Sequence, residues 1–184
     1  MVITGGICTG KSSACAILKE LGYRIIDADK VAHKVLDENA FSIAKMFGDE
    51  YLRGDRVDRK KLAGIIFSNE KNRRKLEDFL HPLIKDEILK EEKEAIDKRE
   101  KYVLDIPLFF EKGNYEAKRV VLIYAPKVLQ IERLMQRDSL SKKDALLRIN
   151  SQMDIEKKRE LADIVIYNDK DLKNLKRELI DAGF

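Results

Sequence analysis

The chain has 184 residues, enough for one sizeable core with inserted lobes but too few for two large independent domains. Charged residues make up 38% of it with the two signs interspersed, so the formal net charge of +4 is a near balance and does not indicate nucleic-acid binding. We find no run of about twenty apolar residues and no apolar signal segment, and therefore expect a soluble cytoplasmic protein without a membrane partner.

The first predicted elements are a strand, a loop and a helix that together form a phosphate-binding motif. Residues 5–12 read GGICTGKS and match GxxxxGK(S/T) at every fixed position. An apolar run over residues 1–4 predicts the strand, and apolar residues spaced i, i+3, i+4 and i+7 from Ala14 to Leu21 predict the helix. In this context the loop N–H groups surround phosphate oxygens, Lys11 reaches the β- and γ-phosphates and Ser12 binds Mg²⁺. A chance match in a Gly-rich turn would leave the flanking pattern unexplained, so we predict nucleotide binding.

A second predicted strand, residues 23–26, ends in Asp27-Ala28-Asp29. Ligands of open α/β sheets lie beyond the carboxyl ends of the strands, so both carboxylates are expected on the rim that carries the phosphate loop. Alternation along an extended segment would send both to the same side. One could accept a proton from a hydroxyl nucleophile while the other orients metal-bound water or substrate. In the alternative, both only cap the following helix; beside a phosphate loop we favour catalysis.

Residues 30–101 are predicted to form an inserted helical lobe, because strand signals vanish and helical periodicity dominates. Three apolar stripes mark helices within it, at residues 40–47, 62–66 and 76–80. His81-Pro82 is expected to interrupt the last helix, because the residue before a proline is pushed out of the α region. His81 could contact substrate or could be structural, and both interpretations stay open.

The remaining strands follow the lobe. Apolar runs place them at residues 102–108, 119–124 and 164–166, before a final helix over residues 171–182. Asp105 in the first run could orient a metal ion beside the phosphate loop. A carboxylate bonded to backbone N–H groups at a strand end is an equal alternative.

Between the last two strands a helical hairpin is predicted to act as a lid. Arg133 and Arg137 are four residues apart and therefore project from the same helix face, where they could clamp a phosphoryl group. Ser141 with Asp144 resembles a capping box that opens the next helix, which carries Arg148. Ordinary surface salt bridges are the alternative for these arginines.

The motifs together point to one family of kinases. No DxxG or NKxD pattern occurs, so a signalling GTPase is not indicated. The chain resembles the dephospho-coenzyme A kinase family along almost its whole length. The resemblance rests on residues 4–7 leading the phosphate loop, 26–29, 81–83, 107–111 and 136–138, and on Arg148, Gln152, Ala162-Asp163 and Asn168 in that order.

This resemblance implies that the ATP γ-phosphoryl is transferred to the ribose 3′-hydroxyl of dephospho-coenzyme A, the last step of coenzyme A biosynthesis. Asp29 would be the general base, Lys11 the phosphate clamp, Ser12 the Mg²⁺ ligand and Arg137 the lid arginine on ATP. The implied nucleotide-binding residues are Cys8, Thr9, Gly10, Lys11, Ser12, Ser13 and Arg137. The implied acceptor-binding residues are Asp29, His81, Pro107 and Leu108.

The implied fold is α/β: a P-loop NTPase with a five-stranded parallel sheet flanked by helices. Residues 1–29, 102–133 and 155–184 would form the nucleotide-binding core, residues 30–101 the helical acceptor lobe and residues 134–154 the lid. We expect a monomer whose partners are ATP and dephospho-coenzyme A, and leave an oligomer open.

Two positions in the phosphate loop depart from the family pattern: Cys8 stands where the family usually has Gly, and Ser13 where it usually has Thr. Cys8 could be an oxidation-sensitive thiol, because a helix N-terminus and Lys11 both favour a thiolate; tolerance of an inert cysteine is the alternative. Two other functions stay open, a kinase for another small hydroxyl or monophosphate acceptor, and a regulatory nucleotide-binding module without transferase activity.

Overall fold

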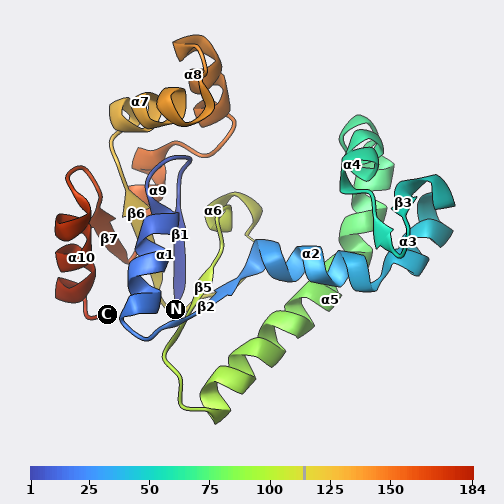
Figure 1. Ribbon diagram of the computed structural model, residues 1–184, viewed down its shortest axis with the longest axis horizontal. Helices are drawn as coiled ribbons and strands as arrows, with labels where there is room; N and C mark the ends of the chain where they lie inside the picture. Colours follow the sequence, from blue (N-terminus) through green and yellow to red (C-terminus); the bar gives the residue numbers. More distant parts are fainter. Residues whose placement is uncertain (114) are drawn as a thin grey trace. The chain divides into compact units, whose positions relative to one another are not determined.

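The computed structural model describes residues 1–113 and 115–184. The chain divides into two compact units (Figure 1). The core unit comprises Met1–Ile25 and Lys98–Phe184, and the helical unit comprises Ile26–Asp97. Across the described ranges, none of the helices combines the length and the apolar character needed to cross a membrane.

The core unit is built on a five-stranded sheet with the strand order β2-β5-β1-β6-β7, in which the last two residues of β2 already belong to the helical unit. Strand β1 pairs in parallel with β5 and β6, and β6 pairs in parallel with β7, which confirms the predicted sheet. The strands are β1 (Val2–Gly5), β2 (Arg24–Asp27), β5 (Tyr102–Asp105), β6 (Val120–Tyr124) and β7 (Ile164–Tyr167). All five residues of β6 are buried, as expected for a central strand covered on both faces.

Helices cover both faces of this sheet because successive strand side chains point to opposite sides. Ile3, Val121 and Ile123 pack in one cluster with apolar residues of α1 and α10, whereas Leu122 and Tyr124 pack with Ile155 of α9. Helices α7 and α8 contact one another as a hairpin between β6 and α9 (Figure 1). The helices of the core unit are α1 (Lys11–Glu20), α6 (Phe109–Lys112), α7 (Lys127–Asp138), α8 (Lys142–Asn150), α9 (Ile155–Leu161) and α10 (Leu172–Asp181).

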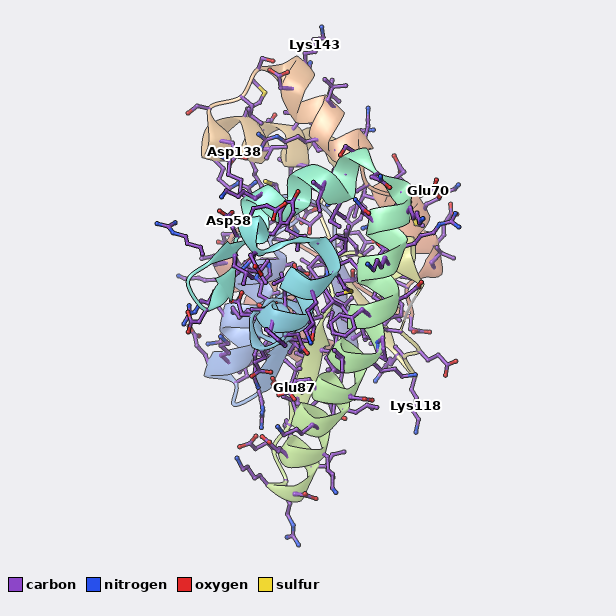
Figure 2. The ribbon with its side chains drawn as sticks, turned by 90° about the vertical axis from the view of Figure 1, so that its right-hand side faces the viewer. Asp58, Glu70, Glu87, Lys118, Asp138 and Lys143 are labelled. Atoms are coloured by element: carbon purple, nitrogen blue, oxygen red, sulfur yellow. The ribbon has the colours of Figure 1, made fainter. Side chains whose placement is uncertain are left out.

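The helical unit is organised around the packing of α2 on α5. Val31 and Val35 of α2 are buried, as are Ile84 and Ile88 of α5, and Lys34 of α2 donates to Glu87 of α5 at 2.5 Å (Figure 2 labels Glu87). The elements of this unit are α2 (Ala28–Glu38), α3 (Ala40–Phe47), the 3₁₀ helix η1 (Asp49–Tyr51), β3 (Leu52–Arg53), β4 (Arg56–Val57), α4 (Arg59–Ser68) and α5 (Glu70–Asp97).

Two predictions for this unit are wrong. A small antiparallel hairpin, β3 with β4, lies inside the stretch predicted to lack strands; its strands have two residues each, too few to show an alternating pattern. Helix α5 also continues through Pro82 instead of ending at His81. Buried residues on both sides of the proline, including Leu80 and Ile84, hold the helix in place, so tertiary packing outweighs the local cost of Pro82.

Candidate active site

The phosphate loop connects β1 to α1 in a conformation that needs glycine at two positions. A Cβ on Gly5 would lie 2.6 Å from Thr9 Oγ1. Gly10 has φ 92°, in the left-handed region, and a Cβ there would lie 1.9 Å from Asn168 Nδ2. Gly10 is also the N-cap of α1, so the free N–H groups of the first helical turn begin directly after it.

Side chains from distant segments hold the carbonyl groups of the loop. Asn168 Nδ2 donates to Thr9 O at 2.8 Å, and the Arg133 guanidinium donates to Cys8 O at 3.5 Å and to Asn168 O at 2.9 Å. Gly6 O accepts from both the N–H and the hydroxyl of Thr9, at 3.3 Å and 3.0 Å. With its carbonyls engaged in this way, the loop can present N–H groups to an anion at the N-terminus of α1.

Lys11 and Asp105 form an ion pair beside the loop. Asp105 ends β5 and is buried, and its second carboxylate oxygen accepts from Cys15 Sγ at 3.6 Å. The sequence had left open a metal-orienting carboxylate or one bonded to backbone N–H groups. The described partners of the carboxylate are two side chains, Lys11 and Cys15, and not backbone N–H groups, whereas the metal-orienting role stays a prediction.

The phosphate loop borders a cavity of about 880 Å³. Loop residues, helix α7 and the segment after β7 all contribute to its wall. The lining residues are Gly6, Cys8, Gly10, Lys11, Ser12, Ser13, Arg133, Gln136, Arg137, Asn168, Lys170, Asp171 and Leu172. The structure therefore brings together most of the nucleotide-binding residues expected from the sequence, and Thr9, which is fully buried, lies beneath the loop surface.

The two arginines of α7 differ in their contacts although both line this cavity. Arg133 is bonded to backbone carbonyls, as described above. Arg137 is 57% exposed and donates to the Asp138 carboxylate at 2.8 Å and 3.2 Å. This hydrogen bond raises the pKa of Arg137 and lowers the pKa of Asp138, which is labelled in Figure 2. Arg148 donates to the same carboxylate at 2.7 Å. In this structure Arg137 and Arg148 therefore form surface salt bridges with Asp138, as the alternative interpretation predicted.

The predicted capping box is confirmed: Ser141 is the N-cap of α8 and accepts from Asp144 N. Beyond the C-terminal end of this helix, Gln152 Oε1 accepts from Ile7 N at 2.9 Å, which ties the segment after α8 to the phosphate loop.

Cys8 adopts φ 56°, a left-handed conformation that glycine adopts most easily. Burial raises the pKa of the Cys8 thiol, and the nearby Arg137 guanidinium lowers it by less. The expectation of a thiolate-favouring environment is therefore wrong, because desolvation outweighs the positive charges near the thiol.

In the helical unit the two aspartates do not share a side in the way that strand alternation predicted. The chain becomes helical at Ala28, so Asp27 is the N-cap of α2 and accepts from Lys30 N, while Asp29 lies exposed in the first turn of α2. His81 is exposed in the middle of α5.

Pro107 and Leu108 belong to the core unit, in the turn after β5, which ends at Asp105 and not at Leu108. Pro107 O accepts from Thr4 Oγ1 at 3.1 Å.

Sequence reasoning did not predict that Asn168, Gln152 and Arg133 hold the loop; it assigned Arg133 to a phosphoryl group. Asn168 is the residue after β7, and a polar residue at the carboxyl end of an apolar strand is a signal that could have identified it. Neither Gln152 nor Arg133 carries a signal for its contact with the loop, because each acts on a segment more than 100 residues away.

The residues present fit a hard divalent cation bound together with a nucleotide. No group of three His, Cys, Asp or Glu side chains that could hold a metal occurs within residues 1–113 and 115–184. Ser12 and Asp105 offer a hydroxyl and a carboxylate beside Lys11, and such oxygen donors suit an ion that takes its other ligands from phosphates and water.

A dephospho-CoA kinase family model matches residues 1–174. The chain belongs to the dephospho-CoA kinase family. A dephospho-CoA kinase of Helicobacter pylori strain J99 is 49% identical over 182 residues, which cover 97% of this chain and 93% of the relative. One from Sulfurimonas denitrificans is 45% identical over 97% of this chain and 89% of its own length.

Solved structures agree with the family assignment. Dephospho-CoA kinase from Campylobacter jejuni superposes with a TM-score of 0.76 at 37% identity and covers 98% of this chain and 93% of its own. The protein TT1252 from Thermus thermophilus superposes with a TM-score of 0.84 at 32% identity and the same coverage. The family and the fold class to which the sequence motifs pointed are thereby confirmed.

Proposed function

We propose that this dephospho-CoA kinase family member transfers the γ-phosphoryl group of Mg²⁺–ATP to the ribose 3′-hydroxyl of dephospho-coenzyme A, giving coenzyme A and ADP. The observation that carries this proposal is the phosphate loop, whose carbonyls at Gly6, Cys8 and Thr9 are each hydrogen-bonded within the core unit. A loop held in this way supplies preorganised N–H donors, and positioning with charge stabilisation is most of what phosphoryl transfer requires from a protein.

In this proposal the nucleotide occupies the cavity of about 880 Å³. Lys11 leaves Asp105 to contact the β- and γ-phosphates, and the backbone of residues 8–13 surrounds them. Arg137 contacts the transferring phosphoryl group from α7, where its exposed side chain is free to exchange Asp138 for a phosphate. Residues 134–154 act as the lid that carries this arginine and excludes water from the reaction.

Ser12 and Asp105 would hold the divalent cation, which we propose to be Mg²⁺. When bound, this ion neutralises charge on the β- and γ-phosphates. Of the chain's own groups, Asp105 would give up its ion pair with Lys11 to help hold the cation, and the ammonium of Lys11 would be left to face the phosphates.

The helical unit is proposed to bind the acceptor, with His81 contributing from this unit and Pro107 and Leu108 from the core unit. Asp29 is proposed as the general base: its exposed carboxylate takes the proton of the 3′-hydroxyl as that oxygen bonds to the γ-phosphorus. The bond from the γ-phosphorus to the bridging oxygen breaks, and ADP leaves with the electron pair. We propose that the protein carries out this reaction as a monomer in the cytoplasm.

The test is ADP release from Mg²⁺–ATP with dephospho-coenzyme A, adenosine, AMP, CMP, shikimate or gluconate as acceptor. We expect turnover with dephospho-coenzyme A alone, and a loss of at least 100-fold for Asp29→Asn with ADP affinity retained. Asp27→Asn is the matched control, because asparagine also caps helices well and should keep most of the turnover. Turnover with another acceptor would show that dephospho-coenzyme A is not the specific substrate. Nucleotide binding without turnover would indicate a regulatory module.

A further inference from the structure

Lys158 on α9 is fully buried, with 0% of its surface exposed. Transferring an ammonium group out of water costs several kcal/mol unless it is paired, and apolar residues of similar size often stabilise a protein equally well or better. The charge at this position therefore calls for an explanation other than stability.

The contacts of Lys158 lead to the start of the phosphate loop. Its ammonium donates to Gly5 O at 3.3 Å and pairs with Glu111 Oε1 at 2.7 Å. Gly5 is the last residue of β1 and the first glycine of the motif. Lys158 thus bonds to the backbone at the residue where the strand turns into the loop.

Glu111, on the short helix α6, connects this lysine to the segment that follows α8. Its Oε1 also accepts from Met153 N at 3.1 Å, and its Oε2 is buried without a hydrogen-bond partner among the described residues. A carboxylate in this position would repel the phosphates of a nucleotide if the ammonium of Lys158 did not compensate its charge.

Gln152 provides a second attachment from the same segment. Its Oε1 accepts from Ile7 N at 2.9 Å, two residues after the contact that Lys158 makes with Gly5. Asn168 and Arg133 hold Thr9 O and Cys8 O in the second half of the loop. The first half is held by the segment that returns from the α7–α8 hairpin to the sheet.

We infer that Lys158, Glu111 and Gln152 form a loop brace: they are positioning residues that set the geometry of the first half of the phosphate loop for nucleotide binding and phosphoryl transfer. This inference rests on the proposed function for its catalytic consequence, whereas its effect on nucleotide binding stands without an acceptor. Because Gln152 lies in the last part of the proposed lid, residues 134–154, the brace also connects that lid to the loop that holds the phosphates.

The experiment compares Lys158→Met, the double variant Lys158→Met/Glu111→Leu and the control Lys157→Met. Lys157 is the neighbouring lysine on α9 and is exposed, so the same substitution there removes a charge without touching the loop. The double variant replaces both charges with apolar groups and is designed to fold even where the single variant leaves Glu111 uncompensated. The dissociation constant of a fluorescent N-methylanthraniloyl-ADP with Mg²⁺ is measured on protein shown to be folded by circular dichroism, together with kcat and both KM values.

We expect Lys158→Met and the double variant to raise the dissociation constant of the ADP analogue at least tenfold and to raise the KM for ATP by a similar factor. The KM for dephospho-coenzyme A should change by less than twofold, and Lys157→Met should match wild type. A purely structural ion pair predicts that folded variants bind the ADP analogue within twofold of wild type, which would overturn the inference. If Lys158→Met does not fold, the double variant decides by the same criterion.

Gln152→Leu tests the second attachment and should weaken binding of the ADP analogue severalfold, because Ile7 N loses its acceptor. Wild-type affinity in this variant would remove Gln152 from the brace. Failure of the proposed function has a different signature: wild type would bind the ADP analogue but not turn over dephospho-coenzyme A, and the binding comparison would still test the brace.

Discussion

Lys11 of the phosphate loop and Asp105 at the end of β5 form an ion pair in which the two side chains are only 16% and 10% exposed. The residue that should contact the nucleotide phosphates is thus already neutralised by a carboxylate. A phosphate group has to compete with Asp105 for Lys11, and a metal ion that takes Asp105 would favour the exchange.

Asp105→Asn tests this competition. Asparagine fills nearly the same space but removes the negative charge. In the presence of EDTA, ADP should therefore bind to the variant severalfold more tightly than to wild type. Turnover with Mg²⁺–ATP should fall at least tenfold, because the carboxylate that could orient the metal is lost. Isothermal titration calorimetry and a coupled ADP assay measure the two quantities. Weaker metal-free binding would mean that Asp105 positions Lys11 instead of competing for it.

Substitutions of the two arginines of α7 should have different effects on stability and on turnover. Arg133→Met removes two hydrogen bonds to backbone carbonyls, so the free energy of unfolding should fall by about 2 kcal/mol and ADP affinity should drop with it. Arg137→Met should leave the melting temperature nearly unchanged, because its ion pair is exposed, but should reduce kcat more than tenfold. Thermal melts and steady-state kinetics measure both. Equal effects of the two substitutions would contradict the division of roles.

Cys8 should react slowly with iodoacetamide at neutral pH. Burial raises the pKa of this thiol, so its thiolate fraction at pH 7 is smaller than that of a free cysteine. The same shift lowers stability as the pH rises through the ordinary cysteine value, because the unfolded chain releases the proton first. A Cys15→Ala background leaves Cys8 as the single thiol of the chain, and the alkylation rate is followed by mass spectrometry from pH 6 to 10. A rate faster than that of a free thiol at pH 7 would refute the prediction.

Tyr124 should titrate well above the ordinary tyrosine value. Burial and its hydrogen bond to Glu156, at 2.6 Å, raise the pKa of Tyr124 to about 12. The folded protein keeps this proton while the unfolded chain loses it near pH ~10, so the stabilising contribution is complete below that pH and disappears as the pH rises through about 12. Absorbance at 295 nm should show one late step that disappears in Tyr124→Phe. A titration that Tyr124→Phe leaves unchanged above pH 11 would count against this assignment.

Pro82→Ala should stabilise the helical unit. Pro82 lies inside α5, where it removes one helical hydrogen bond and its ring crowds the preceding turn. Alanine relieves both costs, and we expect the free energy of unfolding to rise by about 1–2 kcal/mol after the entropy that proline removes from the unfolded chain is counted. Pro126→Ala is the control, because Pro126 is the N-cap of α7 and interrupts no helical hydrogen bond. Denaturant unfolding measures the difference, and a loss of stability in Pro82→Ala would show that the helix is shaped around the proline.

The sequence by itself determined the order and type of the five strands of the sheet and of helices α1, α7, α8 and α10, but it did not predict α6 and α9. Strand β6 is apolar throughout, the Ser141 capping box opens α8, and the glycine-lysine spacing predicts the loop that connects β1 to α1. These features are local: a strand, a cap or a tight turn depends on residues within a few positions of one another, and the pattern is visible in a single window. The family assignment rested on several different local motifs of this kind, which follow one another in order along the chain.

Only the tertiary structure decided how the phosphate loop is held. Gln152, Lys158 and Asn168 contact the loop across sequence separations of 145, 153 and 159 residues, and no periodicity links them to it. Packing likewise decided the continuity of α5 through Pro82, against the local preference of its backbone. In both cases the outcome depends on a sum of contacts between distant segments, and that sum is larger than any local preference the sequence displays.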